Sequence, residues 1–224
     1  MNYEVQMMRL RMAFGGASYG KYASCITKDE YKELMDYARN RKVKLEGFRK
    51  FSGNIDLIKE AVDDIAEIAQ DFPRIISERK SIVLRFDEHI SERDFATTNR
   101  HLISINGNIF NNKEYLEREY QMLADMGTFV TDTSYRSVIR HEVGHVVANI
   151  YGLNPMYIAK EVLQMNTENE ILGYVMNNLS LYAAEYEDGR EFISECFSAY
   201  YSGVDNLFAK EYVNKCKDLA KEVM

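Results

Sequence analysis

Hydrophobic residues recur at helical spacing in the first third of the chain. Thr27 followed by Glu30 forms a capping box, which predicts a helix running to about Arg41. Asn54 opens a second, amphipathic helix, and Pro73 ends it because proline lacks the amide hydrogen that a continuing helix needs. The apolar positions of this second helix lie three or four residues apart: Leu57, Ile58, Val62, Ile65, Ile68 and Phe72.

Two segments in the same region lack a periodic pattern. Gly15, Gly16 and Gly20 interrupt a stretch rich in tyrosine and methionine, which we interpret as a loop or an ill-defined lead-in. Residues 41–50 contain five lysines or arginines, and we interpret them as a solvated connector. The first fifty residues carry no recognisable chemistry.

Strand patterns follow in the middle of the chain. Residues 81–86 form a short apolar run, and residues 101–106 alternate between apolar and polar side chains, so both are predicted strands. Asn111 and Glu114 then open a helix that closes at Gly127. Its apolar positions are Leu116, Tyr120 and Leu123.

The second half of the chain is predicted to be helical, around residues 138–147, 158–163 and 170–176 and from residue 188 onward. Strands followed by a run of helices predict an α+β fold that is predominantly helical, with one small twisted sheet. A soft boundary near residues 75–80 would separate a mostly helical amino-terminal region, residues 1–78, from residues 79–224, on which it would pack.

Composition and charge exclude several classes of protein. The chain has 224 residues, of which 46% are hydrophobic, so it can build a substantial core. Its formal charge of −7 gives no basic field for nucleic acid, and we expect no nucleic-acid partner. We also expect no membrane insertion, because no apolar run is long enough, and a cytoplasmic location, because the amino terminus lacks a signal sequence.

The three cysteines agree with a reducing compartment. Cys25, Cys196 and Cys216 are odd in number and widely separated, so neither a disulfide framework nor a thiolate zinc site is expected. Cys196 is predicted to lie on the apolar face of its helix as a small buried residue.

The stretch His141-Glu142-Val143-Gly144-His145 carries the clearest chemistry in the sequence. On a helix, positions four apart project from one face, so both imidazoles can bind one metal ion, with Glu142 beside them. This H-E-x-x-H pattern is the signature of zinc metallopeptidases, in which zinc polarises the scissile carbonyl and acidifies water, and the glutamate is the general base.

A chance match on a surface helix is the alternative, and three features count against it. The chain has only four histidines, and the motif takes two of them. The flanking residues are apolar, as a buried helix requires. Gly144, which is costly inside a helix, would leave room for the close approach of a neighbouring element.

A third metal ligand is predicted downstream. Glu191 and Glu195 lie four residues apart on a predicted helix, where one carboxylate can bind the metal and the other can accept the N–H of a ligating histidine. We assign Glu191 as the ligand and Glu195 as the partner of the histidine. A capping box begun by Asp188 is the alternative explanation for Glu191. His89 and His101 have no partner at metal-binding spacing.

The sequence resembles the gluzincins related to anthrax lethal factor, a group that includes Pro-Pro endopeptidases and proteins of clostridial phages and mobile elements. The residues that carry the resemblance are the H-E-x-x-H helix, Glu191-Phe192-Ile193-Ser194-Glu195-Cys196-Phe197, and Leu179-Ser180-Leu181-Tyr182-Ala183. The 45 residues between His145 and Glu191 suit this branch better than thermolysin-like enzymes.

The resemblance covers roughly residues 80–203 and implies a zincin-like metallopeptidase domain within residues 79–224. It implies one zinc ion per chain, held by His141, His145 and Glu191, with Glu142 as base and Glu195 behind a histidine. It also implies a sheet whose edge strand pairs with an extended substrate, and residues 101–106 are the candidate edge.

The sequence departs from the family at the tyrosine that donates a hydrogen bond to the oxyanion. Tyr182 lies nine residues before Glu191, about two more than the family pattern, and Tyr186 lies five before it. Either tyrosine could serve, and with 16 tyrosines in the chain a packing role is an equal alternative.

The sequence therefore predicts a zinc-dependent endopeptidase that acts on an extended polypeptide. The alternative is a catalytically silent, zinc-stabilised binding or structural protein of a phage or mobile element, because function often departs from fold. The uncertain tyrosine keeps this alternative open.

Overall fold

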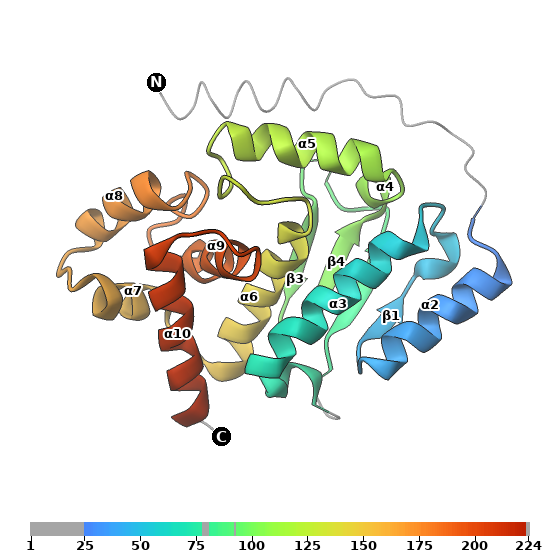
Figure 1. Cartoon of the computed structure of the whole chain (residues 1–224), viewed down its shortest axis with the longest axis horizontal. Coiled ribbons are helices and arrows are strands. Elements are labelled where there is room, and N and C mark those ends of the chain that lie inside the picture. The colour runs from blue at the N-terminus through green and yellow to red at the C-terminus, as the bar shows by residue number, and fades with distance from the viewer. Residues whose placement is uncertain (1–24, 78–80, 92, 223–224) are drawn as a thin grey trace.

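The computed structural model describes residues 25–77, 81–91 and 93–222. It is an α+β structure in which helices predominate around one small mixed sheet, as predicted (Figure 1). The glycine-rich lead-in and its proposed loop lie outside the described residues. None of the helices within the described ranges combines the length and the apolar character needed to cross a bilayer.

Two capped helices begin the described chain, as their sequence signals predict. Thr27 and Glu30 form the capping box of α2 (Lys28–Asn40). Asn54 caps α3 (Ile55–Asp71), which ends directly before Phe72 and the 3-10 turn Pro73–Ile76. The apolar face of α3 is fully buried, so the helical spacing of its apolar residues indicates the face that packs into the core.

The interpretation of residues 41–50 as a solvated connector is wrong. They contain the strand β1 (Lys44–Glu46) and the 3-10 turn Phe48–Lys50. Val43, Leu45 and Phe48 are buried between the exposed basic side chains. The charged side chains of β1 therefore lie on the exposed face of a short edge strand.

The sheet has the strand order β1-β2-β4-β3. β2 (Val83–Asp87) and β4 (Leu102–Asn106) are the two predicted strands, and they pair in parallel. β1 also pairs in parallel with β2, whereas β3 (Ala96–Asn99) is antiparallel to β4. The prediction that residues 101–106 form an edge is therefore wrong, because β4 lies between β2 and β3.

The remaining elements are helical. After the short helix α4 (Gly107–Phe110) comes α5 (Lys113–Asp125), whose cap is Asn112 and not the predicted Asn111. The motif helix is α6 (Ser137–Tyr151). The predicted insertion contains α7 (Pro155–Leu163) and α8 (Glu168–Asn178), and α9 (Arg190–Tyr201) and α10 (Leu207–Glu222) complete the chain.

The helix α6 lies at the centre of the molecule (Figure 1). It packs on β3 and β4 on one side, on α3 on another, and most extensively on α9. Four consecutive residues of β4, from Ile103 to Asn106, are buried beneath these layers. α3 and β1 come from the predicted amino-terminal region, yet they contact α6 and β2 directly. The division into residues 1–78 and 79–224 stays a prediction.

At Gly144, α6 and α9 approach one another closely. A Cβ atom on Gly144 would lie 2.7 Å from the Cα atom of Ser194, so any larger residue would collide with the backbone of α9. This confirms the expectation that Gly144 admits a neighbouring element. The contact sets the separation of the two helices that carry the predicted metal ligands.

Candidate metal centre

Two neighbouring turns of α6 place the predicted histidine ligands side by side. The ring centroids of His141 and His145 are 5.0 Å apart, with an angle of 79° between the ring planes. Apolar neighbours such as Val143 and Val146 are fully buried, which anchors the helix beneath the two rings. His141 is itself buried and His145 is half-buried, so the pair faces a partly enclosed space.

Glu191 reaches the histidines from α9. Its Oε2 atom lies 3.1 Å from Nε2 of His141 and 3.2 Å from Nε2 of His145. The capping-box explanation for Glu191 is wrong, because Gly189 caps α9 and no side chain caps the helix. The Asp188 carboxylate instead binds Arg190. The Glu191 side chain is therefore directed at the motif helix.

Glu195 holds the other nitrogen of His141. Its Oε1 atom lies 2.8 Å from Nδ1 of His141, and its Oε2 atom accepts hydrogen bonds from the Ser180 hydroxyl and the Val130 amide. Because a carboxylate can only accept, Nδ1 of His141 carries the proton of this bond. A neutral His141 then presents a lone pair at Nε2, which is the form that binds a metal.

The geometry of these donors fits a zinc ion. The ligand atoms of His141, His145 and Glu191 all lie within 4.8 Å of one another. A tetrahedral zinc with bonds of about 2.0–2.1 Å separates its ligand atoms by about 3.3 Å, close to the two distances found here. Oε2 of Glu191 is buried and accepts no aligned hydrogen bond from the described residues, so it is free to bind a cation.

The buried carboxylates and histidines shift one another's pKa values. Burial alone would raise the pKa of Glu191, but the contacts with His141 and His145 outweigh burial and lower that pKa. Burial alone would lower the pKa of His141, but the carboxylates of Glu191 and Glu195 raise it well above 6.5. The two carboxylates therefore favour a positive charge at His141.

Glu142, the predicted general base, lies on α6 beside His141 and faces β3. Its Oε2 atom accepts a hydrogen bond of 2.6 Å from the hydroxyl of Thr98. Glu142 is buried, and its carboxylate is held at one oxygen by the sheet. Sequence reasoning did not identify Thr98. The two adjacent threonines of a short polar strand gave no signal beyond their β-branched side chains.

The two candidate tyrosines have different surroundings. The Tyr182 ring lies 5.6 Å from the His141 ring, and burial followed by the Glu191 charge raises the pKa of its phenol. Tyr186 is 39% exposed and packs under the Arg190 guanidinium, and its pKa is raised chiefly by the Glu185 charge. Tyr182 therefore borders the candidate centre as a protonated donor, whereas Tyr186 lies at the surface.

A cavity of about 110 Å³ opens beside His141 and Glu142. Phe95, Phe129 and Tyr182 contribute aromatic walls to it. These rings pack edge to face with one another, which holds the walls rigid. The space is large enough for a medium-sized apolar side chain and adjoins the predicted base.

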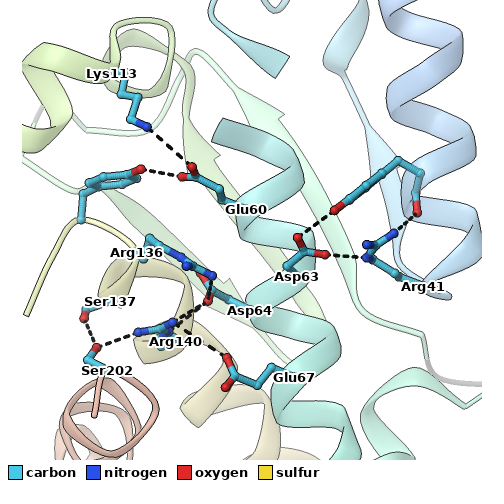
Figure 2. Close-up of polar contacts among 12 residues, drawn as sticks. Arg41, Glu60, Asp63, Asp64, Glu67, Lys113, Arg136, Ser137, Arg140 and Ser202 are labelled. Atoms are coloured by element: carbon cyan, nitrogen blue, oxygen red, sulfur yellow. Dashed lines mark hydrogen bonds and ion pairs between the residues drawn. The ribbon is translucent and has the colours of Figure 1, made fainter. Parts of the chain in front are cut away.

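The amino-terminal half of α6 is anchored to α3 by buried charge, as Figure 2 shows. Asp64 of α3 is fully buried and pairs with Arg136 at 2.6 Å and with Arg140 at 2.9 Å. Arg140 also donates to the Ser202 hydroxyl, which bonds Ser137. Because Arg140 directly precedes His141, this network fixes the start of the ligand helix. Sequence reasoning missed Asp64, which reads as one of several acidic residues on α3.

The remaining histidines and the cysteines lie outside the group of candidate ligands. His89 and His101 are exposed and belong to no group of potential metal ligands in the described ranges. Cys196 and Cys216 are buried free thiols, and burial raises the pKa of each, whereas Cys25 is exposed.

Comparisons of the chain with protein-family models, curated proteins and solved structures found no match. The assignment to the gluzincins therefore stays a prediction from the motifs.

Proposed function

We propose that this protein is a zinc-dependent endopeptidase of the gluzincin type that hydrolyses an extended polypeptide. One observation carries the proposal: Nε2 of His141, Nε2 of His145 and Oε2 of Glu191 converge from two helices, and Glu142 directly follows His141 on α6. Two neutral nitrogens and one carboxylate are the donor set of catalytic zinc sites, which keep a position open.

Zinc bound by these three residues would supply the Lewis acidity that polarises a carbonyl and acidifies water near neutral pH. The protein's own groups would do the rest. Glu195 and Ser180 keep His141 in the tautomer whose Nε2 is unprotonated. Glu142 would take the proton of the attacking water and pass it to the nitrogen of the leaving amine.

Tyr182 is the residue we assign to the developing negative charge on the substrate oxygen. Its phenol borders His141, and its raised pKa keeps the proton that a hydrogen bond must donate. Such a donor, aimed at an oxyanion, is worth about 3 kcal/mol of the barrier. Tyr186 is exposed and pairs with Arg190, so it is the less suitable of the two.

The sheet and the cavity favour an extended polypeptide as substrate. β3 is an edge strand beside α6, and an extended peptide can pair with such an edge through its main chain. The aromatic cavity next to Glu142 would receive one side chain of that peptide. The acidic chain offers no comparable feature for nucleic acid.

The test is incubation of zinc-loaded protein with a diverse peptide library, with the products read by mass spectrometry. Glu142→Gln is the matched control, because it keeps the three metal ligands and removes only the base. We expect cleavage by the wild type, abolished by chelator, and a loss of at least 100-fold in the variant with zinc content unchanged. Equal cleavage by both proteins would reject Glu142 as base. No cleavage by a protein that holds one zinc would favour the silent binding protein.

A further inference from the structure

Thr98 links the sheet to the predicted base through a short hydrogen bond. Its hydroxyl lies 2.6 Å from Oε2 of Glu142 and 3.3 Å from the main-chain carbonyl of the same residue. A hydroxyl has one hydrogen to donate, and the shorter distance is that of a charge-assisted bond to a carboxylate. The proton therefore goes to the side chain of Glu142.

The register of β3 shows what the main chain of Thr98 does. The Asn106 amide donates to the Phe95 carbonyl, and the pairs Ala96 with Ile105 and Thr98 with Ile103 follow along the ladder. Antiparallel pairs alternate between hydrogen-bonded and non-bonded, so the amide and carbonyl groups of Ala96 and Thr98 face away from β4. In the described sheet β3 pairs with no other strand, and these groups therefore point to the open edge.

The side chains of β3 point alternately to the two faces of the sheet. Ala96 and Thr98 are half-buried towards α6, whereas Thr97 and Asn99 are exposed on the other face. Thr98 is thus the residue at which an open main-chain position and a contact with the predicted base coincide. An extended peptide that pairs with this edge would form main-chain hydrogen bonds with Thr98, the residue whose side chain binds Glu142.

We propose that Thr98 is a positioning residue for Glu142. Its hydroxyl fixes Oε2, which selects one side-chain conformation of the glutamate and leaves Oε1 to receive the proton of water. Within the described residues, the side-chain hydrogen bond of Glu142 is the one to Oε2, which leaves Oε1 without a competing donor. The proposal rests on the proposed function, because a positioned base matters only where a proton is transferred.

Three substitutions on one strand test the proposal. Thr98→Val keeps the shape and the strand preference but removes the hydroxyl, Thr98→Ser restores the hydroxyl, and Thr97→Val makes the same change on the exposed face. We expect Thr98→Val to lower kcat about 10–100-fold, as small misplacements of catalytic groups do, with KM and zinc content little changed. Thr98→Ser should recover most of the loss, and Thr97→Val should match the wild type.

Wild-type kcat in Thr98→Val, or a loss that Thr98→Ser does not recover, would overturn the proposal. So would a loss explained by missing zinc. A second measurement is independent of turnover: urea midpoints of the metal-free wild type, Thr98→Val, Glu142→Ala and the double variant. We expect the midpoint shift of the double variant to be smaller than the sum of the two single shifts, because Thr98 and Glu142 share one contact. Additive midpoint shifts would reject the contact between Thr98 and Glu142. A folded, zinc-loaded wild type that cleaves nothing would instead reject the proposed function, and with it any catalytic role of Thr98.

Discussion

Replacing Gly144 with alanine should damage zinc binding far more than it damages folding. The new Cβ would lie 2.7 Å from Cα and 3.2 Å from the amide nitrogen of Ser194, both of them backbone atoms. Because carbon atoms pack best at about 3.5–4.0 Å, α6 and α9 must separate locally by about 1 Å. A flexible side chain could turn aside, but the backbone of a packed helix can only shift.

The shift falls between the predicted metal ligands. His145 follows Gly144 directly, and Glu191 lies three residues before Ser194, one helical turn away on α9. Metal–ligand distances tolerate only about 0.2 Å, so a separation of about 1 Å must pull Glu191 away from the two histidines. We expect zinc affinity to fall by about 10–100-fold, the scale found when the groups that orient ligands are disturbed.

The free energy of unfolding should change less. Overpacking costs about 1–3 kcal/mol, and replacing a helical glycine with alanine returns about 1 kcal/mol, which leaves a net loss of about 0–2 kcal/mol. Gly173→Ala on α8 is the matched control, because a Cβ there meets nothing within 4 Å. It should gain up to about 1 kcal/mol and leave zinc affinity unchanged.

Competition with a chromophoric chelator would measure zinc affinity, and urea unfolding of the metal-free proteins would measure stability. The decisive comparison is between the two alanine variants. If Gly144→Ala bound zinc as tightly as the wild type and gained stability as Gly173→Ala does, the close approach of α6 to Ser194 could not be correct.

Two further predictions concern the surroundings of the ligands. Asp64→Asn should lower the free energy of unfolding by about 3 kcal/mol, because it leaves the buried Arg140 with only the Glu67 carboxylate, 3.8 Å away. Asp63→Asn, whose partner Arg41 is partly exposed, should cost under about 1 kcal/mol. Equal losses in urea unfolding would contradict the buried network. The zinc-induced rise in Tm should grow with pH from about 6 upward. The pKa of His141 is higher in the folded protein than in the unfolded chain. The contacts of protonated His141 therefore stabilise the metal-free protein fully below about pH 6.5, and this stabilisation is lost as pH rises through the folded pKa. Above that pKa, zinc no longer has to displace a proton. A rise in Tm that is independent of pH would reject proton competition at His141.

The pairing of the candidate ligands within each helix could be predicted, because helix geometry alone relates residues four apart. Residues four apart share a face, so the spacing places His141 with His145 on one face of α6 and Glu191 with Glu195 on one face of α9. The caps of α2 and α3 were predictable for the same reason, since Thr27 and Asn54 act on amides two or three residues away. Local rules suffice where the interacting groups are local.

The short strands were not predictable from pattern. β1 has three residues and β3 has four, too few for alternation to stand out from charged or polar neighbours. β1 is a strand because Val83 and its neighbours pair with it across a long stretch of chain. The choice of β4 as edge failed for a related reason: the position of a strand in the sheet depends on a partner, β3, that the pattern did not reveal.

The contacts that refine the site were also hidden in the sequence. Thr98, Ser180 and Asp64 are each separated from their partners by 15 or more residues, and each is a common residue type with ordinary neighbours. Only the folded chain shows that they meet Glu142, Glu195 and Arg140. The motif predicts which groups react, whereas the orientation of those groups comes from tertiary packing.

These orienting contacts are made by the protein's own side chains and backbone. The backbone contact of Gly144 with Ser194 sets the distance between the ligand helices, Asp64 holds the start of α6, and Glu195 fixes the ring of His141. Small zinc domains fold only with their metal, because the ion replaces a core that they lack. Here the ligands lie between helices that already bury large apolar faces, and a proton on His141 can balance the buried carboxylates. Metal should therefore add stability to a fold that exists without it, so that a variant which loses zinc remains folded and its loss of activity can be assigned to the site.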